Sequence, residues 1–589
     1  MVFVYRFAVP ALLVFASTLS GQSLFPLKDV RPGMHGVGRT VFSGDRIEEF
    51  QVEILGVLEN TGPHESIILG KLSGGPLAET GVMQGMSGSP VYIDGRLVGA
   101  VALAYAFSKE PIAGIRPIED MIRPVATRAA VSAPRAPIAL APNELLRAFP
   151  QPGLAMGGGA QMVDIATPLS FGGFTRAALD AFAPQLRSLG LEPRQAVSSA
   201  GKLPDTMGNP ADVKPGSMIS VQLLSGDYNV GADGTVTYID GNRIYAFGHR
   251  FLDVGATSLP FARSEVLALI PNTNTSFKLS AAREWMGTIG YDGNTAVSGE
   301  FGKRAATVPV SVIVTRDSKH IESYEMQMVN DPLLSPLLVQ MAVFSAIDAT
   351  ERTVGAATLR ITGEIAFQNA PSPVRINNMF SGDNGSATQA SLSMAVPVAY
   401  VMQSDFDTLR LKSVALNIEA FEQKKELTID GLTVSQREAR PGDTVRLNVS
   451  LVGENGAETS RHLDYKIPIG AEPGPLFFTV ADAGTTNVTD FHQVLGATVH
   501  TPSQLISTVN NLHPNTRAYI RVWRTDPAFQ LEGVDLPAPP ASVTLVFSES
   551  QTSLAGISQT RNSKIAEMEI DAGEVVVSGV KTAQVEIKE

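Results

Sequence analysis

The stretch Gly85–Leu103, GMSGSPVYIDGRLVGAVAL, decides the fold class of this chain. Two apolar runs, Val91–Ile93 and Leu97–Leu103, flank the dipeptide Asp94-Gly95. This dipeptide is favoured in the two-residue turns of β-hairpins. The sequence therefore predicts a β-hairpin that follows directly on a glycine-rich turn.

Ser87 lies in that turn, between Gly85 and Gly88. Glycine allows the backbone to turn sharply, and the turn can leave two N–H groups free to face a substrate carbonyl. The pattern is typical of a serine nucleophile, with the N–H groups of Gly85 and Ser87 as the oxyanion hole. Ser89 is the alternative nucleophile, and a purely structural glycine turn is the competing interpretation.

Composition favours a mainly β protein of several domains. The 589 residues suffice for about three or four domains, and the 53 glycines and 38 prolines show no period, which suits many short strands and turns.

The chain has no cysteine, which excludes disulfides, thiol chemistry and cysteine zinc sites. Without a His-Glu-x-x-His motif we expect no metal and no cofactor. A net charge of −12 argues against a nucleic-acid partner.

The N-terminus has the pattern of a secretory signal peptide. Arg6 supplies a positive charge, Phe7–Ala16 form a short apolar core, and small residues at Thr18–Gly21 offer a cleavage site. This core is shorter than the ~20 residues that a spanning helix needs, and no later segment reaches that length. We expect a secreted or periplasmic protein without an integral membrane segment.

Changes in composition along the chain predict its domains. An Ala/Pro-rich stretch, Ala126–Pro142, indicates a linker, and the alternation in Arg440–Leu451 indicates a β-sandwich-like module. We expect helices at Phe174–Gly190 and at Thr501–Leu512. The predicted division is a signal peptide (1–21), the first half of a catalytic domain (22–125), a linker (126–160), the second half (161–365), a connecting β region (366–426), a sandwich-like module (427–485) and a C-terminal α+β region (486–589).

Histidines are the candidate bases for Ser87, because a serine hydroxyl needs a neighbouring base to take its proton. In Gly234–Asp253, GTVTYIDGNRIYAFGHRFLD, a hairpin with its turn at Asp240-Gly241 places His249 just past a strand end. His35 is the second candidate because it lies in the same unit as Ser87. A surface or packed core residue is the ordinary role of a single histidine.

The segment Gln84–Val101 resembles the nucleophile segment of the SpoIVB peptidases, the sporulation-signalling serine proteases, and Gly234–His249 resembles their histidine segment. The similar regions are Arg31–Ile122 and Lys214–Ile313. The resemblance implies that Ser87 is the nucleophile and His249 the general base. It also implies the paired β-barrel of trypsin-like proteases.

Two features depart from that family. In the family the histidine segment precedes the serine segment, whereas here Ser87 comes first, as a permuted two-barrel enzyme would allow. The family also places an aspartate upstream of the serine, where this chain has Ser73. Either Asp253 replaces that acid, or the enzyme works as a Ser-His dyad, or the protein is not an active protease.

The sequence therefore predicts a mainly β, secreted or periplasmic serine endopeptidase of the SpoIVB type. Its expected substrates are proteins or peptides, and the resemblance to a self-processing family implies its own chain as a further substrate, with the linker as the expected place of the cut. The alternative is a catalytically inactive binding or scaffold protein of the cell envelope. Carbohydrate binding has little support, since the chain contains only two tryptophans.

Overall fold

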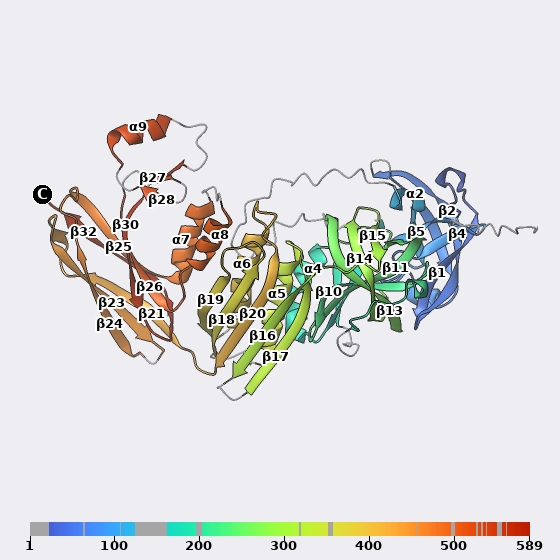
Figure 1. Ribbon diagram of the computed structural model, residues 1–589, viewed down its shortest axis with the longest axis horizontal. Helices are drawn as coiled ribbons and strands as arrows, with labels where there is room; N and C mark the ends of the chain where they lie inside the picture. Colours follow the sequence, from blue (N-terminus) through green and yellow to red (C-terminus); the bar gives the residue numbers. More distant parts are fainter. Residues whose placement is uncertain are drawn as a thin grey trace, which may run out of the picture.

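Figure 1 shows the chain extended along one axis, from the first unit in blue to the C-terminal modules in orange and red. The computed structural model describes residues 23–62, 65–105, 108–123, 162–195, 203–316, 320–350, 357–383, 385–454, 456–495, 501–525, 528–531, 534–536, 539–549, 557–560 and 562–589. The predicted signal peptide and linker lie outside these residues.

The first unit is a closed ring of strands. A sheet of order β4-β1-β2-β3-β6-β5-β7 has an additional pairing of β4 with β5, which closes β1–β6 into what we call the first ring. Phe50, Ile68 and Val91 are fully buried inside it. Its elements are β1 (His35–Ser43), β2 (Arg46–Gly62), β3 (Glu65–Ser73), α1 (Leu77–Thr80), β4 (Pro90–Ile93), β5 (Arg96–Tyr105), β6 (Ile112–Pro117), α2 (Ile118–Met121) and the added β7 (Met162–Asp164).

The hairpin predicted after the Ser87 turn is formed by β4 and β5. Ile93 pairs with Arg96, so Asp94 and Gly95 are the two turn residues. Both have positive φ, 50° and 72°, as a type I′ turn requires. The prediction is confirmed.

The second unit contains another ring. In its 13-stranded sheet, the strands β10–β15 lie side by side in the order β10-β13-β14-β15-β12-β11. An additional pairing of β10 with β11 joins the two ends of this row and closes it into the second ring. Strands β16–β20 extend the sheet, and α5 and α6 pack together on this extension. The elements are β8 (Thr167–Gly172), α4 (Arg176–Ser188), β9 (Leu191–Gln195), β10 (Met218–Gly226), β11 (Asn229–Asp240), β12 (Arg243–Ala246), β13 (Gly255–Ile270), β14 (Phe277–Asp292), β15 (Val297–Phe301), β16 (Thr307–Arg316), β17 (His320–Val329), α5 (Leu334–Thr350), β18 (Ala357–Phe367), β19 (Val374–Gly382), α6 (Ser386–Met402) and β20 (Leu411–Phe421).

The hairpin expected near His249 is formed by β11 and β12. Asp240 pairs with Arg243, so the turn residues are Gly241 and Asn242, one position later than the dipeptide Asp240-Gly241 indicates. Asp240 stays extended and continues the ladder, while Gly241 takes the positive φ of 57°. His249 follows the end of β12, as predicted.

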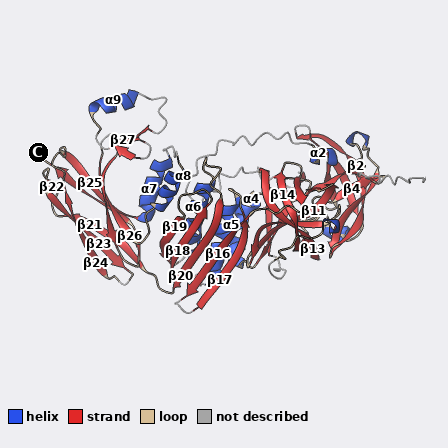
Figure 2. Ribbon diagram, viewed as in Figure 1, coloured by secondary structure: helices blue, strands red, loops and turns tan. Residues whose placement is uncertain are grey.

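The C-terminal part is a sandwich of two sheets, of orders β24-β23-β21-β31 and β22-β32-β25-β26-β30. In β23 the alternating Val445, Leu447, Val449 and Leu451 are all buried, which confirms the predicted pattern. Figure 2 shows the helices of this part beside the sheets. Its elements are β21 (Glu426–Val434), β22 (Glu438–Ala439), β23 (Thr444–Gly453), β24 (Glu458–Lys466), β25 (Gly474–Asp482), α7 (Ala483–Leu495), α8 (Pro502–Asn510), β26 (Arg517–Arg524), β27 (Ala528–Leu531), β28 (Val534–Leu536), α9 (Ala541–Glu549), β29 (Ile557–Thr560), β30 (Ser563–Asp571), β31 (Val576–Ser578) and β32 (Val580–Ile587).

Both helices predicted from the sequence are present. In α4, the Thr175 side chain accepts a hydrogen bond from the Ala178 N–H. In α8, Thr501 and Gln504 form a capping box, which satisfies two free N–H groups at the helix start. The buried Leu505 joins the core of the second unit, so α8 connects the sandwich to the larger sheet.

The predicted mainly β class is confirmed. The domain boundaries stay a prediction, although the sandwich takes strands from both 427–485 and 486–589. Within the described ranges, none of the helices has the length and apolar character needed to cross a bilayer.

Candidate functional site

The Ser87 turn of the first unit docks on strand β11 of the second ring. The Thr235 N–H donates to the Ser87 carbonyl oxygen at 2.9 Å. The Thr235 hydroxyl donates to the Gly85 carbonyl at 2.8 Å, and the Thr237 hydroxyl donates to the Gly88 carbonyl at 2.7 Å. Three hydrogen bonds from one strand therefore fix the backbone around the candidate nucleophile.

Gly88 makes this close approach possible. Its φ is +90°, and a Cβ at this position would lie 2.0 Å from the Thr235 carbonyl oxygen and 2.6 Å from the Phe247 nitrogen. Both neighbours are backbone atoms, which cannot move aside without separating the strands. Only glycine fits between the turn and the β11–β12 hairpin.

Two N–H groups of the turn stay free. The Met86 N–H donates to Met83, and the Gly88 N–H donates to Val101. The N–H groups of Gly85 and Ser87 donate to nothing within the part of the chain that the structure describes. These are the two groups predicted to form the oxyanion hole.

The same hairpin delivers His249. After β12 the chain passes through Phe247 and Gly248, both at positive φ, 72° and 71°. Gly248 lies against β5, where a Cβ would be 3.2 Å from the Ala102 Cβ and 3.3 Å from the Val101 carbonyl oxygen. One hairpin thus contacts the Ser87 turn through β11 and brings His249 to the first ring through β12.

The two candidate catalytic atoms are buried and unpaired. Ser87 is 0% exposed and His249 2% exposed. The Ser87 Oγ and the His249 Nε2 have no hydrogen-bond partner among the described residues. Buried polar groups are almost always paired, because an unpaired one costs about 1–3 kcal/mol. Two such atoms at one interface are therefore typical of a site that binds or transforms a ligand.

The other ring nitrogen of His249 settles its tautomer. Nδ1 lies 2.6 Å from the Arg250 carbonyl oxygen, and since a carbonyl can only accept, Nδ1 carries the proton. Nε2 of the neutral ring is then a free acceptor. Burial lowers the pKa of His249 below its usual value, while the charge of Asp164 acts in the opposite direction. The ring is neutral at pH 7, as a general base must be.

Asp164 is a carboxylate that the sequence analysis missed. It ends β7, which pairs with β5 through Leu103. Its charge raises the pKa of His249, and its Oδ2 lies 3.9 Å from the Arg250 Nε. Nothing in the sequence around Asp164 marks it as a site residue. Only the return of the chain to the edge of β5, after residues 124–161, brings it near the histidine.

Asp253, the acid predicted to replace the family's aspartate, lies at a cleft. It has a positive φ of 58° and lines a cleft of about 740 Å³, together with Tyr245 and Tyr291. Burial raises the pKa of Asp253, partly offset by Arg250. Asp253 is not among the charged groups that shift the pKa of His249. Its catalytic role stays a prediction.

The alternative residues take other positions. Ser89 is buried, and its Oγ donates to the Thr40 hydroxyl at 3.0 Å. His35 is exposed at the start of β1, where it pairs with Glu53. Ser73 is exposed at the end of β3. Of the candidates, Ser87 and His249 are the two that the β11–β12 hairpin brings to one interface.

Lys278 is a second residue that the sequence analysis missed. It is 1% exposed in β14, and its Nζ lies 2.6 Å from the Thr40 hydroxyl. Burial lowers the pKa of Lys278 to about 7. In the sequence it is a single lysine in a strand, which normally indicates a solvent-exposed position.

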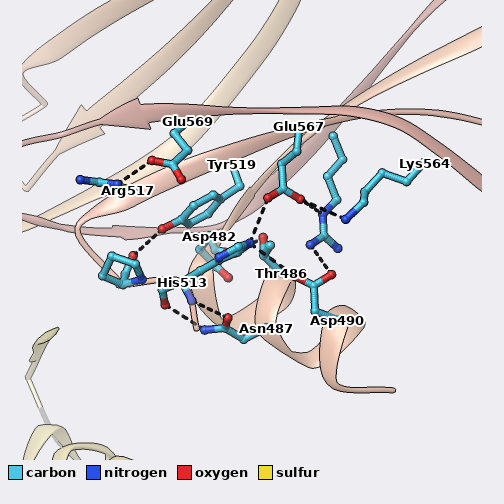
Figure 3. A network of polar contacts seen from close by, with 12 residues as sticks. Asp482, Thr486, Asn487, Asp490, His513, Arg517, Tyr519, Lys564, Glu567 and Glu569 are labelled. Atoms are coloured by element: carbon cyan, nitrogen blue, oxygen red, sulfur yellow. Dashed lines mark hydrogen bonds and ion pairs between the residues drawn. The ribbon is translucent and has the colours of Figure 1, made fainter. Parts of the chain in front are cut away.

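A polar cluster in the sandwich has the spacing of a metal site. Asp490, His513 and Glu567, drawn together in Figure 3, each offer a ligand atom within 4.8 Å of the others. Arg521 already holds both carboxylates, through Asp490 Oδ1 at 2.5 Å and Glu567 Oε2 at 2.8 Å. His513 Nε2 lies 3.1 Å from the other Glu567 oxygen, and the Tyr519 ring stacks on His513. This arrangement fits an ion-pair network that fastens α7 to the sandwich better than it fits a cation.

We predict that Glu567→Gln destabilises the sandwich by about 1–3 kcal/mol at pH 6. The contacts with His513 and Arg521 lower the pKa of Glu567 from 4.5 to about 2. The folded state therefore gains stability from this carboxylate above pH 4.5 and loses it as the pH falls toward 2. Urea unfolding followed by Trp523 fluorescence measures the effect. Glu569→Gln, in an exposed pair on the same strand, is the control and should change stability by less than about 1 kcal/mol.

We predict that Lys278→Met raises the stability of the protein near pH 7. The pKa of Lys278 is about 7 in the folded state and 10.5 in its ordinary state. Between these values the unfolded chain binds a proton that the folded chain does not, so stability rises with pH across this window. The substitution should raise Tm at pH 7 and flatten the dependence of Tm on pH between 7 and 10. An unchanged Tm profile would contradict the burial of an uncharged amine.

We predict that Gly88→Ala separates the Ser87 turn from β11. The new methyl group would overlap the Thr235 carbonyl oxygen, which adds overpacking of about 1–3 kcal/mol to the strain of a positive φ. Gly95→Ala is the matched control, because Gly95 also has positive φ but has open space, with no atom within 4 Å, where its methyl group would lie. Differential scanning calorimetry should show a markedly larger fall in Tm for Gly88→Ala. Equal losses would mean that strain alone explains the glycine.

Comparison with known proteins finds one similarity, which lies in the first unit. No curated protein and no solved structure matches the chain. Residues 26–122 match the family model of the SpoIVB peptidase S55, a range that contains β1–β6 and Ser87 but not His249. Residues 26–122 are therefore similar to the SpoIVB peptidase S55 family, which agrees with the resemblance predicted from the nucleophile motif.

Proposed function

We propose that this protein is an extracytoplasmic serine endopeptidase in which Ser87 is the nucleophile and His249 the general base. The observation that carries the proposal is the pair of buried atoms, Ser87 Oγ and His249 Nε2, that lack a partner among the described residues at the contact between the two rings. The family match of residues 26–122 supports the reaction class. The proposed substrates are proteins or peptides.

The proposed reaction starts at the serine. His249 Nε2 takes the proton of the Ser87 hydroxyl as Oγ attacks the scissile carbonyl carbon. The free N–H groups of Gly85 and Ser87 stabilise the resulting oxyanion, a contribution of about 10²–10³ in rate for each donor. When the C–N bond breaks, Nε2 returns the proton to the leaving amine. Water then hydrolyses the acyl-enzyme by the same route in reverse.

Asp164 is the proposed carboxylate of this site. Its charge favours the imidazolium that forms when His249 accepts the proton, as the direction of its effect on the pKa of His249 indicates. The Arg250 carbonyl, and not a carboxylate, accepts the Nδ1 proton. The arrangement corresponds to a Ser-His dyad with an electrostatic partner, which accounts for a chain that has Ser73 in place of the family's aspartate.

One observation favours the second candidate, a binding protein without catalysis. The Ser87 Oγ and the His249 Nε2 are both shielded from solvent, so a substrate reaches them only after the groups that cover them move. A protein that never undergoes this movement would use its peptidase fold as a scaffold.

Covalent labelling of the full chain with a fluorophosphonate probe distinguishes the two functions. We expect mass spectrometry to locate the label on Ser87. Ser87→Ala should abolish labelling, and His249→Ala should slow it at least about 100-fold, because general-base catalysis contributes that much. His35→Ala is the control and should label at the wild-type rate. Absence of label on folded wild-type protein would refute the peptidase and support the scaffold.

The same assay compares the two carboxylates. Asp164→Asn should slow labelling more than Asp253→Asn, because of these two carboxylates Asp164 is the one that acts on the pKa of His249. A larger loss of labelling rate in Asp253→Asn than in Asp164→Asn would instead support Asp253 as the acid of the site, as the sequence suggests.

A further inference from the structure

Lys278 contacts one end of the Ser87 turn directly and the other end through Thr40. A Cβ on Gly85 would be 3.2–3.4 Å from the Cδ, Cβ and Cγ atoms of Lys278, so the lysine stem packs against the start of the turn. The Lys278 N–H also donates to the Gln84 carbonyl at 3.1 Å. At the other end, the amine reaches Ser89 through the hydroxyl of Thr40.

We propose that Lys278 is a positioning residue for the nucleophile: its side chain packs against Gly85, links to Ser89 through the Thr40 hydroxyl, and so fixes the orientation of Ser87. This inference rests on the proposed peptidase function. It adds a residue that neither the nucleophile motif nor the family match contains, since residues 26–122 end before β14.

The contacts of the amine suit its uncharged form. An ammonium group has three N–H donors, whereas Nζ has two acceptors within reach in the described residues, the Thr40 hydroxyl at 2.6 Å and the Met218 sulfur at 3.6 Å. A neutral amine has two N–H donors, which the Thr40 hydroxyl and the Met218 sulfur accept, while the Thr40 hydroxyl also accepts from Ser89. Each N–H donor of the neutral amine is then paired.

Among the described residues, no charged group compensates a positive charge on Lys278. Arg39 of β1 pairs outward with Glu49, and Arg263 and Glu265 of β13 pair with one another and with other surface groups. Asp233 of β11 accepts from Ser170. Burial is the sole cause of the lowered pKa of Lys278, and no charged group contributes to it.

The turn should therefore sense pH. Protonation of Lys278 below about pH 7 creates a buried charge without a counter-ion, which is relieved when the turn shifts and admits water. A nucleophile displaced by 1 Å can lose about 10²-fold in rate. The lysine then limits activity on the acid side at a higher pH than His249, whose pKa is lowered below 6.5.

The test is the pH profile of the fluorophosphonate labelling rate at Ser87, measured on the full chain. For wild type we expect the rate to fall on the acid side with a midpoint near pH 7. For Lys278→Met, which keeps the length of the side chain and removes the amine, we expect a rate about 10- to 100-fold lower at pH 8 and a midpoint below pH 6.5. Lys412→Met, at an exposed lysine in β20, is the control and should reproduce the wild-type profile.

A second pair of variants covers a failure of Lys278→Met to fold. Thr40→Val removes the hydroxyl between Lys278 and Ser89 and should slow labelling, whereas Thr40→Ser keeps the hydroxyl and should restore it. Unchanged rates and midpoints in both Lys278→Met and Thr40→Val, with Ser87 labelled in wild type, would overturn the positioning role and leave the peptidase intact. Absence of label in wild type at every pH would refute the peptidase, and the positioning role with it.

Discussion

The docking of the Ser87 turn on strand β11 is the contact on which the rest of the site depends. Thr235 holds the carbonyl groups of Gly85 and Ser87, and Gly88 permits the approach because it has no side chain. The same hairpin continues into His249. Neither ring contains the candidate site alone, since the first supplies the proposed nucleophile and the second supplies both its support and the proposed base. Chain order is irrelevant to the geometry of such a site, so the position of Ser87 before His249 does not exclude it.

The interface carries polar groups that a purely structural contact would avoid. Within the described part of the chain, Ser87 Oγ and His249 Nε2 are buried without partners, and Lys278 is buried without a counter-ion. Each feature opposes folding, because desolvation of a polar or charged group is unfavourable unless a partner replaces water. Such groups concentrate where chemistry needs them. Their coincidence at the contact between the two rings is the physical argument for a reactive site over a scaffold.

Local patterns predicted the elements well. Asp94-Gly95 indicated the type I′ hairpin, Thr501 the helix cap, and the alternation in β23 a buried face, because each depends on residues adjacent in the chain. Asp164 and Lys278 could not be found in this way. Asp164 approaches His249 through the pairing of β7 with β5, and Lys278 meets the Ser87 turn through the pairing of Gln84 with the start of β14. Long-range pairings of this kind leave no local signal in the sequence.

A crystal structure of the protein after reaction with a fluorophosphonate would test the central claim most directly. The account predicts phosphorus bonded to Ser87 Oγ, one phosphonyl oxygen within about 3 Å of the N–H groups of Gly85 and Ser87, and His249 Nε2 within hydrogen-bond distance of the adduct. Thr235 should still hold the turn. An adduct on another residue, or a Ser87 adduct with His249 remote from it, would contradict a catalytic pair assembled by the β11–β12 hairpin.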